Sequence, residues 1–137
     1  GIGFAVPSNT AKRIIPDLLK YGYVRRPWLG VEPIPTVYLR RLGLDIPEGM
    51  LISRVVRGAT AAKAGLRGAT RQVVVGRYQV PWGGDILTHV NQQPVRTMEE
   101  LAAQIETRKA GEVITLDYIR DNRKESVKAT LVLRPRS

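Results

Sequence analysis

Cysteine is absent from this chain of 137 residues, and histidine occurs once. Disulfide bonds, thiolate metal sites and cysteine nucleophiles are therefore excluded. One histidine with scattered carboxylates does not supply the ligand set of a zinc site, so we expect neither a metal ion nor a cofactor. No apolar run approaches the roughly 18 residues from which a membrane-spanning helix is inferred.

The residues of a serine-protease triad are missing as well. The one histidine, His89, falls inside an expected strand, where a position facing water or a rim explains it better than a general base. None of the serines stands in the Gly-x-Ser-x-Gly setting that a nucleophile needs; they are Ser8, Ser53, Ser126 and Ser137. The adjacent Glu99 and Glu100 are explained by a helix N-terminus. We therefore expect no catalytic residue.

Acidic residues are few beside basic ones: 12 Asp and Glu against 22 Lys and Arg, a net charge of +10. Such an excess is typical of nucleic-acid or anionic-membrane surfaces. Here the basic residues come in ones and twos, such as Arg25-Arg26 and Arg123-Lys124, with few aromatic residues among them to stack on bases. The pattern favours a solvated shell and no nucleic-acid partner, and a basic domain that binds nucleic acid or an anionic membrane surface stays the alternative.

Hydrophobic alternation and turn residues predict a strand-rich fold with short helices. Strands are expected at residues 29–34, 49–56, 85–90, 113–119 and 127–133, with a hairpin-like insertion over 72–80. Helices are expected at residues 36–42, capped by Thr36, at 59–64, and near 98–108. Thr97 and Glu100 match the capping-box pattern, in which each side chain bonds the other residue's amide.

The first 22 residues carry a pattern of their own. Residues 2–7 read as a short apolar strand, and Ser8-Asn9-Thr10 precedes an amphipathic helix that stops at Gly22. The chain begins with Gly1 and shows no basic-then-apolar leader, so we expect a fragment of a longer protein.

Five motifs follow one another along the chain: Gly1-Ile-Gly-Phe-Ala-Val-Pro7, Arg26-Pro-Trp-Leu-Gly-Val31, Gly49-Met-Leu-Ile-Ser-Arg-Val-Val56, Ala61-Ala-Lys-Ala-Gly-Leu66 and Gly84-Asp-Ile-Leu87. In this order they resemble the end of the protease domain and the circularly permuted PDZ domain of HtrA/Deg serine proteases. The resemblance implies a mainly β fold with helices (α+β), a PDZ-like, partly open antiparallel β-barrel or sandwich capped by two or three helices. It also implies a protease-domain remnant at 1–24, a linker at 25–27, and a PDZ domain at 28–137 with an insertion at about 67–83.

By this resemblance the chain recognises the hydrophobic C-terminal ends of polypeptides and does not cut them. The carboxylate-binding loop would be Trp28, Leu29, Gly30 and Val31, whose backbone amides surround the terminal carboxylate. The peptide groove would comprise Glu32, Ile34, Leu101, Gln104, Ile105 and Arg108.

The peptide would lie as an added strand between residues 31–34 and the helix near 98–108. Its last side chain would meet an apolar pocket, lined by Leu29, Val31, Leu101 and Ile105, with Gln104 and Arg108 on the rim. For Leu101 and Ile105 an ordinary core position stays an alternative. If Val31 faces the peptide, so do Pro33 and Pro35, which have no N–H, so we expect main-chain bonds to the last two or three peptide residues alone.

The resemblance implies further partners. They are the protease domain of the same chain and other copies of a homo-oligomeric parent, a trimer by analogy. The parent would be a serine endopeptidase outside the cytoplasm, in the bacterial periplasm or cell envelope.

Overall fold

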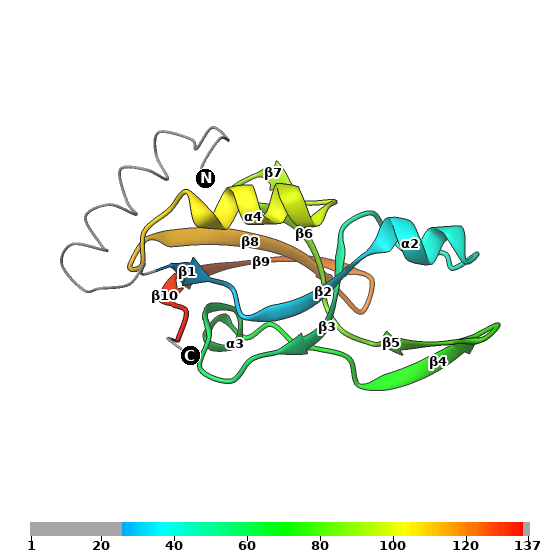
Figure 1. The fold of residues 1–137 in the computed structure, drawn as a ribbon. Helices are drawn as coiled ribbons and strands as arrows, with labels where there is room; N and C mark the ends of the chain where they lie inside the picture. Colours follow the sequence, from blue (N-terminus) through cyan, green and yellow to red (C-terminus); the bar gives the residue numbers. More distant parts are fainter. Residues whose placement is uncertain (1–25, 136–137) are drawn as a thin grey trace, which may run out of the picture.

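A computed structural model describes residues 26–135, and the strand and helix expected within residues 1–24 lie outside the described residues. Antiparallel pairing joins five strands in the order β2-β3-β6-β8-β9, with the short β7 on β6. Their bounds are β2 Val31–Pro35, β3 Met50–Val55, β6 Ile86–Val90, β7 Gln93–Pro94, β8 Val113–Arg120 and β9 Arg123–Thr130. Among the described strands, β2 is therefore an edge of the sheet (Figure 1).

Two smaller sheets and three helices complete the described residues. The small sheets pair β1 (Pro27–Trp28) with β10 (Val132–Leu133) and β4 (Arg71–Val75) with β5 (Tyr78–Trp82). The helices are α2 (Thr36–Arg41), α3 (Thr60–Ala64) and α4 (Met98–Glu106). The predicted mainly β fold with helices is confirmed, and the sheets stay open instead of closing into a barrel.

The first three residues of β3, Met50 to Ile52, are buried on both faces of the sheet, and this divides the core in two. Met50 and Ile52 belong to a main cluster with Leu87, whereas Leu51 belongs to a second cluster with Ile86. Successive side chains of a strand point to opposite faces of the sheet, so neighbouring residues enter different clusters. The α4 side chains pack on the main cluster, and α2 and the β4–β5 hairpin cover the second one.

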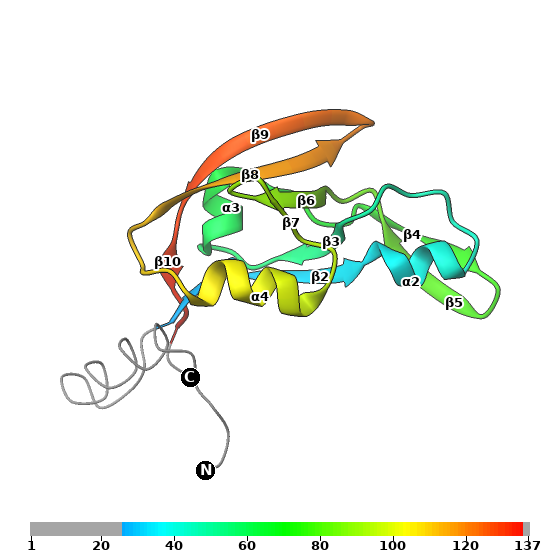
Figure 2. The same ribbon diagram turned by 90° about the horizontal axis from the view of Figure 1, so that it is seen from above.

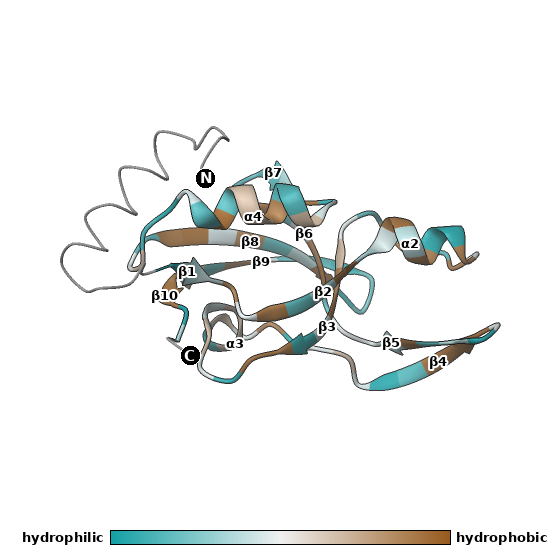
Figure 3. Cartoon of the chain, viewed as in Figure 1, coloured by the Kyte–Doolittle hydropathy of each residue, from teal (hydrophilic) through white to brown (hydrophobic). Residues whose placement is uncertain are grey.

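The β4–β5 hairpin occupies the middle of the predicted insertion. Its two strands are joined at Gly76-Arg77, and β4 changes from hydrophilic to hydrophobic toward this turn (Figure 3). Val73, Val75 and Val80 pack on the second cluster. The insertion is thus part of a core, and not a surface loop without packing partners.

The start of α2 differs from the sequence prediction, whereas α4 starts at the predicted Thr97. Thr36 does not cap α2, because Pro35 holds the N-cap position and the buried Thr36 Oγ1 accepts the amide of Gly49 at 2.9 Å. At α4, Thr97 Oγ1 accepts the amide of Glu100 at 3.1 Å, as predicted. The Glu100 carboxylate accepts the amide of Arg96 at 2.9 Å and also bonds the Arg96 guanidinium. The Thr97 amide is a smaller cause of the lowered pKa of Glu100.

Candidate binding groove

A groove of about 230 Å³ lies between the edge strand β2 and helix α4. The two elements run with their axes roughly parallel (Figures 1 and 2). The groove is lined by Arg26, Pro27, Trp28, Leu29, Gly30, Val31, Pro33, Met98, Leu101, Ala102, Ile105, Glu106 and Arg134. Because β3 pairs with the other edge of β2, no strand within residues 26–135 lies beside the edge that faces α4.

The floor of the groove is the outer side of the main core. Leu29, Leu101 and Ile105 are 4–7% exposed and belong to the main cluster, and they also line the groove. The two readings of Leu101 and Ile105, core and pocket lining, therefore both apply. An apolar side chain entering here would meet aliphatic carbon on its inner side.

One face of α4 forms the wall opposite β2. Met98, Leu101, Ala102, Ile105 and Glu106 line the groove at spacings of three and four residues, which places them on one side of a helix. Met98, Ala102 and Glu106 were missed in the sequence, although the helical period alone extends the face from Leu101 and Ile105 to them. Pro33 was missed as a lining residue because it was considered for its absent N–H alone.

Four predicted groove residues do not line the groove. Glu32 is exposed and lies 3.8 Å from Arg54, and Ile34 packs against the second cluster. Arg108 donates from Nε to the carbonyl of Gln104 at 2.7 Å, and it pairs with Glu112 at 3.6 Å. The helical period places Gln104 on the side of α4 that faces away from the groove. The bond to the Gln104 carbonyl keeps the Arg108 side chain on the same side.

The loop at one end of the groove turns its carbonyls inward. The carbonyl of Trp28 accepts the Thr60 hydroxyl at 2.6 Å, that of Leu29 the Ala61 amide at 2.9 Å, and that of Gly30 the Val56 amide at 2.7 Å. Within residues 26–135, no acceptor is bonded to the amides of Leu29 and Gly30. The loop therefore presents unpaired N–H donors.

Gly30 is required by this loop for two reasons. Its φ of 76° lies in the left-handed region that glycine alone adopts without cost. A Cβ at this position would also collide with the Cβ of Ala59, on the approach to α3. The predicted loop from Trp28 to Val31 is thus a specific turn that needs glycine and packs closely against Ala59.

Charged side chains stand at the same end of the groove. Arg134, just after β10, places its guanidinium 5.7 Å from the centre of the Trp28 ring, and its amide donates to the carbonyl of Arg26 at 2.7 Å. Arg26 and Glu106 also line the groove. The indole Nε1 of Trp28 is buried and has no hydrogen-bond acceptor in the described part of the chain. The end of the groove thus combines donors and positive charge with apolar surface.

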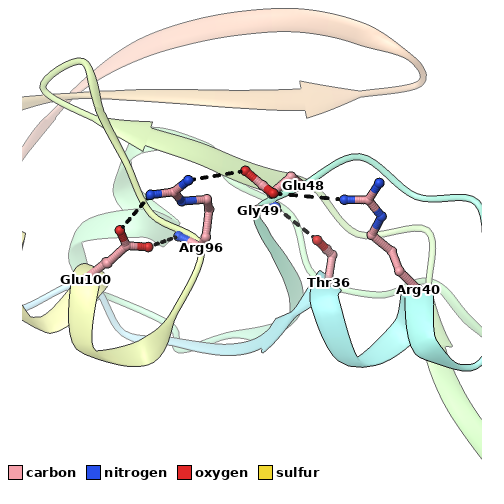
Figure 4. Close-up of polar contacts among 6 residues, drawn as sticks. All are labelled: Thr36, Arg40, Glu48, Gly49, Arg96 and Glu100. Carbon is pink, nitrogen blue, oxygen red and sulfur yellow. Dashed lines mark hydrogen bonds and ion pairs between the residues drawn. The ribbon is translucent and has the colours of Figure 1, made fainter.

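A row of charged residues connects α2 to the start of α4 (Figure 4). Glu48 lies 4.0 Å from Arg40 and 3.7 Å from Arg96, and Arg96 lies 3.1 Å from Glu100. The hydrogen bond from the Arg96 side chain lowers the pKa of Glu100, and the same bond raises the pKa of Arg96. These exposed pairs orient the first turn of the groove wall and add little stability.

Over residues 26–135, no group of three His, Cys, Asp or Glu side chains could hold a metal ion. The open edge of a sheet, a facing helix and a loop of unpaired amides together define a PDZ-like module. The sequence model of the PDZ domain matches residues 2–131, and the chain belongs to the PDZ domain family.

Curated relatives connect this module with periplasmic proteases. The chain is 32% identical over 133 residues to a probable periplasmic serine protease do/HhoA-like of Haemophilus influenzae. It is 30% identical over 133 residues to the periplasmic serine endoprotease DegP of Escherichia coli K12. Each match covers 96% of this chain and 25% of the relative, so the chain spans about a quarter of the length of these relatives.

Solved structures of HtrA-type proteases are also similar to this chain. The HtrA-type protease AlgW with a decapeptide is 25% identical, with a TM-score of 0.66 over 100% of this chain and 38% of that chain. AlgW with a tripeptide is 27% identical, with a TM-score of 0.65 over 100% of this chain and 41% of that chain. Among the described residues, no helix has the length and apolar character needed to cross a membrane.

Proposed function

We propose that this chain is the peptide-binding PDZ module of an HtrA-like serine protease, and that it binds the hydrophobic C-terminal ends of polypeptides. The observation that carries this proposal is the pair of unpaired amides at Leu29 and Gly30, at the end of an apolar groove. A terminal carboxylate is an anion that needs several donors, and a concave set of backbone N–H groups supplies them.

The expected affinity follows from a few interactions. A buried aliphatic side chain contributes ~1.5–3 kcal/mol, and each hydrogen bond to a carboxylate ~1.5–3 kcal/mol. Association costs ~4–15 kcal/mol in lost freedom, so a micromolar Kd, about −8 kcal/mol, is expected. Arg26 and Arg134 add attraction for the chain end.

The role in a parent protein is part of the same proposal. The relatives are named periplasmic serine proteases, and two solved neighbours are described with bound peptides. The module captures substrates or regulates a protease domain of the same chain, outside the cytoplasm, in a homo-oligomeric parent.

The test uses fluorescence anisotropy with the labelled peptide Gly-Ser-Gly-Ser-Gly-Ala-Leu-Val, as the free acid and as the C-terminal amide. We expect the amide to bind at least tenfold more weakly, the loss that ~1.4 kcal/mol of charge-assisted bonding gives. Equal affinity of acid and amide contradicts the proposal.

A pair of variants locates the binding surface. Ala102 lines the groove and Ala103, next to it on α4, is exposed and does not. We expect Ala102→Glu to abolish measurable binding, because its carboxylate fills the groove and repels the peptide end. Ala103→Glu adds the same side chain to the same helix and should bind normally. Equal effects of the two substitutions place the peptide elsewhere.

A further inference from the structure

The bonds between β2 and β3 show which main-chain groups of β2 face the groove. The carbonyl of Gly30 accepts the Val56 amide at 2.7 Å, and the carbonyl of Glu32 accepts the Ser53 hydroxyl at 2.7 Å. Just after β2, the amide of Thr36 donates to the carbonyl of Gly49 at 2.9 Å. Within β2, the even-numbered positions Glu32 and Ile34 therefore turn their main-chain polar groups toward β3.

The alternation is not broken by the irregularity in this pairing. Glu32 lies opposite Arg54 and Pro33 opposite Ile52, so the extra residue, Ser53, belongs to β3. A bulge in one strand leaves the partner strand regular. The main-chain groups of Val31, Pro33 and Pro35 consequently point away from β3, and the first two of these residues line the groove.

This edge of β2 offers acceptors but almost no donors. The carbonyls of Val31, Pro33 and Pro35 lie on this edge, and Val31 and Pro33 line the groove. Val31 alone of the three has an N–H group. Pro33 also lines the groove, so its ring carbons stand where an amide hydrogen would otherwise meet the peptide. A peptide added as a strand can donate its N–H groups to this edge at alternate residues. Upstream of the peptide's last residue, however, the peptide carbonyls find no N–H partner on β2.

We infer that the groove accepts hydrogen bonds from the N–H groups of the peptide's last and third-last residues and leaves the peptide carbonyls upstream unbonded. The grip therefore ends at about the third residue. This inference rests on the proposed function, and it names the ligand class: polypeptide ends with an apolar last residue and an arbitrary sequence before the last three. Pro33 and Pro35 are the residues that set this limit.

The first test acts on the peptide and leaves the protein unchanged. The probes are the free-acid octapeptide Gly-Ser-Gly-Ser-Gly-Ala-Leu-Val and acetyl-Ala-Leu-Val. We expect the short peptide to bind within about threefold of the long one, because the added residues gain no full hydrogen-bonded pair. An increase of more than about tenfold from three to eight residues overturns the inference.

Methylation of single amide nitrogens locates the donors. Methylation at Val, the last residue, or at Ala, the third-last, should weaken binding at least about fivefold, since each removes a bond to the carbonyl of Val31 or Pro33. The same change at Leu, the second-last, is the control and should have little effect, because that N–H points away from β2. Equal losses at all three positions overturn the inference.

Substitution in the protein supplies the reverse test. Pro33→Ala restores an N–H at the groove edge and should tighten binding of the octapeptide about fivefold. Pro47→Ala, at an exposed proline away from the groove, should leave it unchanged. Unaltered affinity in a folded Pro33→Ala variant contradicts the inference.

The two proposals fail in different ways. Failure of the proposed function appears as equal binding of free acid and amide. Failure of the inference appears as strong length dependence, while the preference for the free acid persists.

Discussion

At the scale of single residues, the groove end depends on a side chain far away in the sequence. Arg134 reaches Trp28 because β1 and β10 pair, with Trp28 opposite Val132. The aromatic ring holds the guanidinium from one side, which leaves its charge facing the groove. The pairing of β1 with β10 therefore fixes the position of the Arg134 charge at this end of the groove.

We expect Arg134→Ala to weaken binding of the free-acid octapeptide about threefold to tenfold at 20 mM salt, because one positive charge near the carboxylate is lost. The effect should shrink at 500 mM salt, where exposed charges are screened. Arg123→Ala, at the exposed first residue of β9, is the matched control. Anisotropy titrations of both variants measure the difference, and equal changes would exclude a local role for Arg134.

Glu100 is a second residue whose charge can be tested alone. The hydrogen bond from the Arg96 side chain lowers its pKa, with the bond from the Arg96 amide as the next cause. We expect Arg96→Gln to raise the pKa of Glu100 toward the ordinary glutamate value, measured by NMR titration of the side-chain carboxyl. Arg40→Gln removes the other cation beside Glu48 and should leave the pKa of Glu100 unchanged.

The sign of the effect on stability follows from the direction of this shift. The pKa of Glu100 is lower in the folded state than in the unfolded state, so its contribution is present above the unfolded pKa. That contribution is lost as the pH falls through the folded pKa. The pair is exposed, so the change in unfolding free energy should be small.

At the scale of elements, the β4–β5 hairpin contributes to stability without forming part of the groove. Val80 is 4% exposed in the second cluster, whereas Val74 on the other strand is 72% exposed. We expect Val80→Ala to lower the unfolding free energy by about 1–3 kcal/mol, since it removes two buried carbons and leaves a void. Val74→Ala should change it by less than about 0.5 kcal/mol.

The peptide affinity of the same variants shows whether the second cluster contributes to binding. The second cluster does not line the groove, so folded Val80→Ala protein should bind the octapeptide within about twofold of the parent chain. Denaturant unfolding supplies the stability and anisotropy the affinity. A large loss of affinity would show that the hairpin supports the groove.

The elements predicted from sequence are those with local signals. Gly65 ends α3 in the left-handed conformation, Thr97 caps α4, and the turn at Asp121-Asn122 joins β8 to β9. Each depends on residues within a few positions of one another, and a pattern of polar and apolar residues records it. The apolar floor of the groove was instead expected from the family resemblance.

Contacts between distant segments were not predictable in this way. Nothing near Thr36 indicates that its hydroxyl bonds the amide of Gly49, and nothing near Arg134 indicates the Trp28 ring. The insertion had a visible apolar run, but its packing against α2 arises from the tertiary fold. The loop conformation at Gly30 was inferred from the resemblance, and the collision with Ala59 gives its physical reason.

At the scale of the whole molecule, the net charge of +10 is partly compensated pair by pair. Arg40, Arg54, Arg96, Arg108 and Arg120 each lie within 4.0 Å of a carboxylate. The Arg120 pair with Asp85 is the most buried of these, since the Asp85 side chain is 2% exposed. The remaining basic side chains form a field that attracts any anion at low salt.

Salt dependence distinguishes a peptide groove from a general basic surface. A peptide held through one carboxylate loses one charge interaction on screening, so its Kd should rise less than about threefold between 50 and 200 mM salt. A DNA duplex bound through several phosphates would lose about a thousandfold or more over this range. The amidated peptide is the control, and its weaker binding should hardly depend on salt. Tighter binding of duplex DNA than of the octapeptide at 200 mM salt would instead favour the basic surface as the principal binding site.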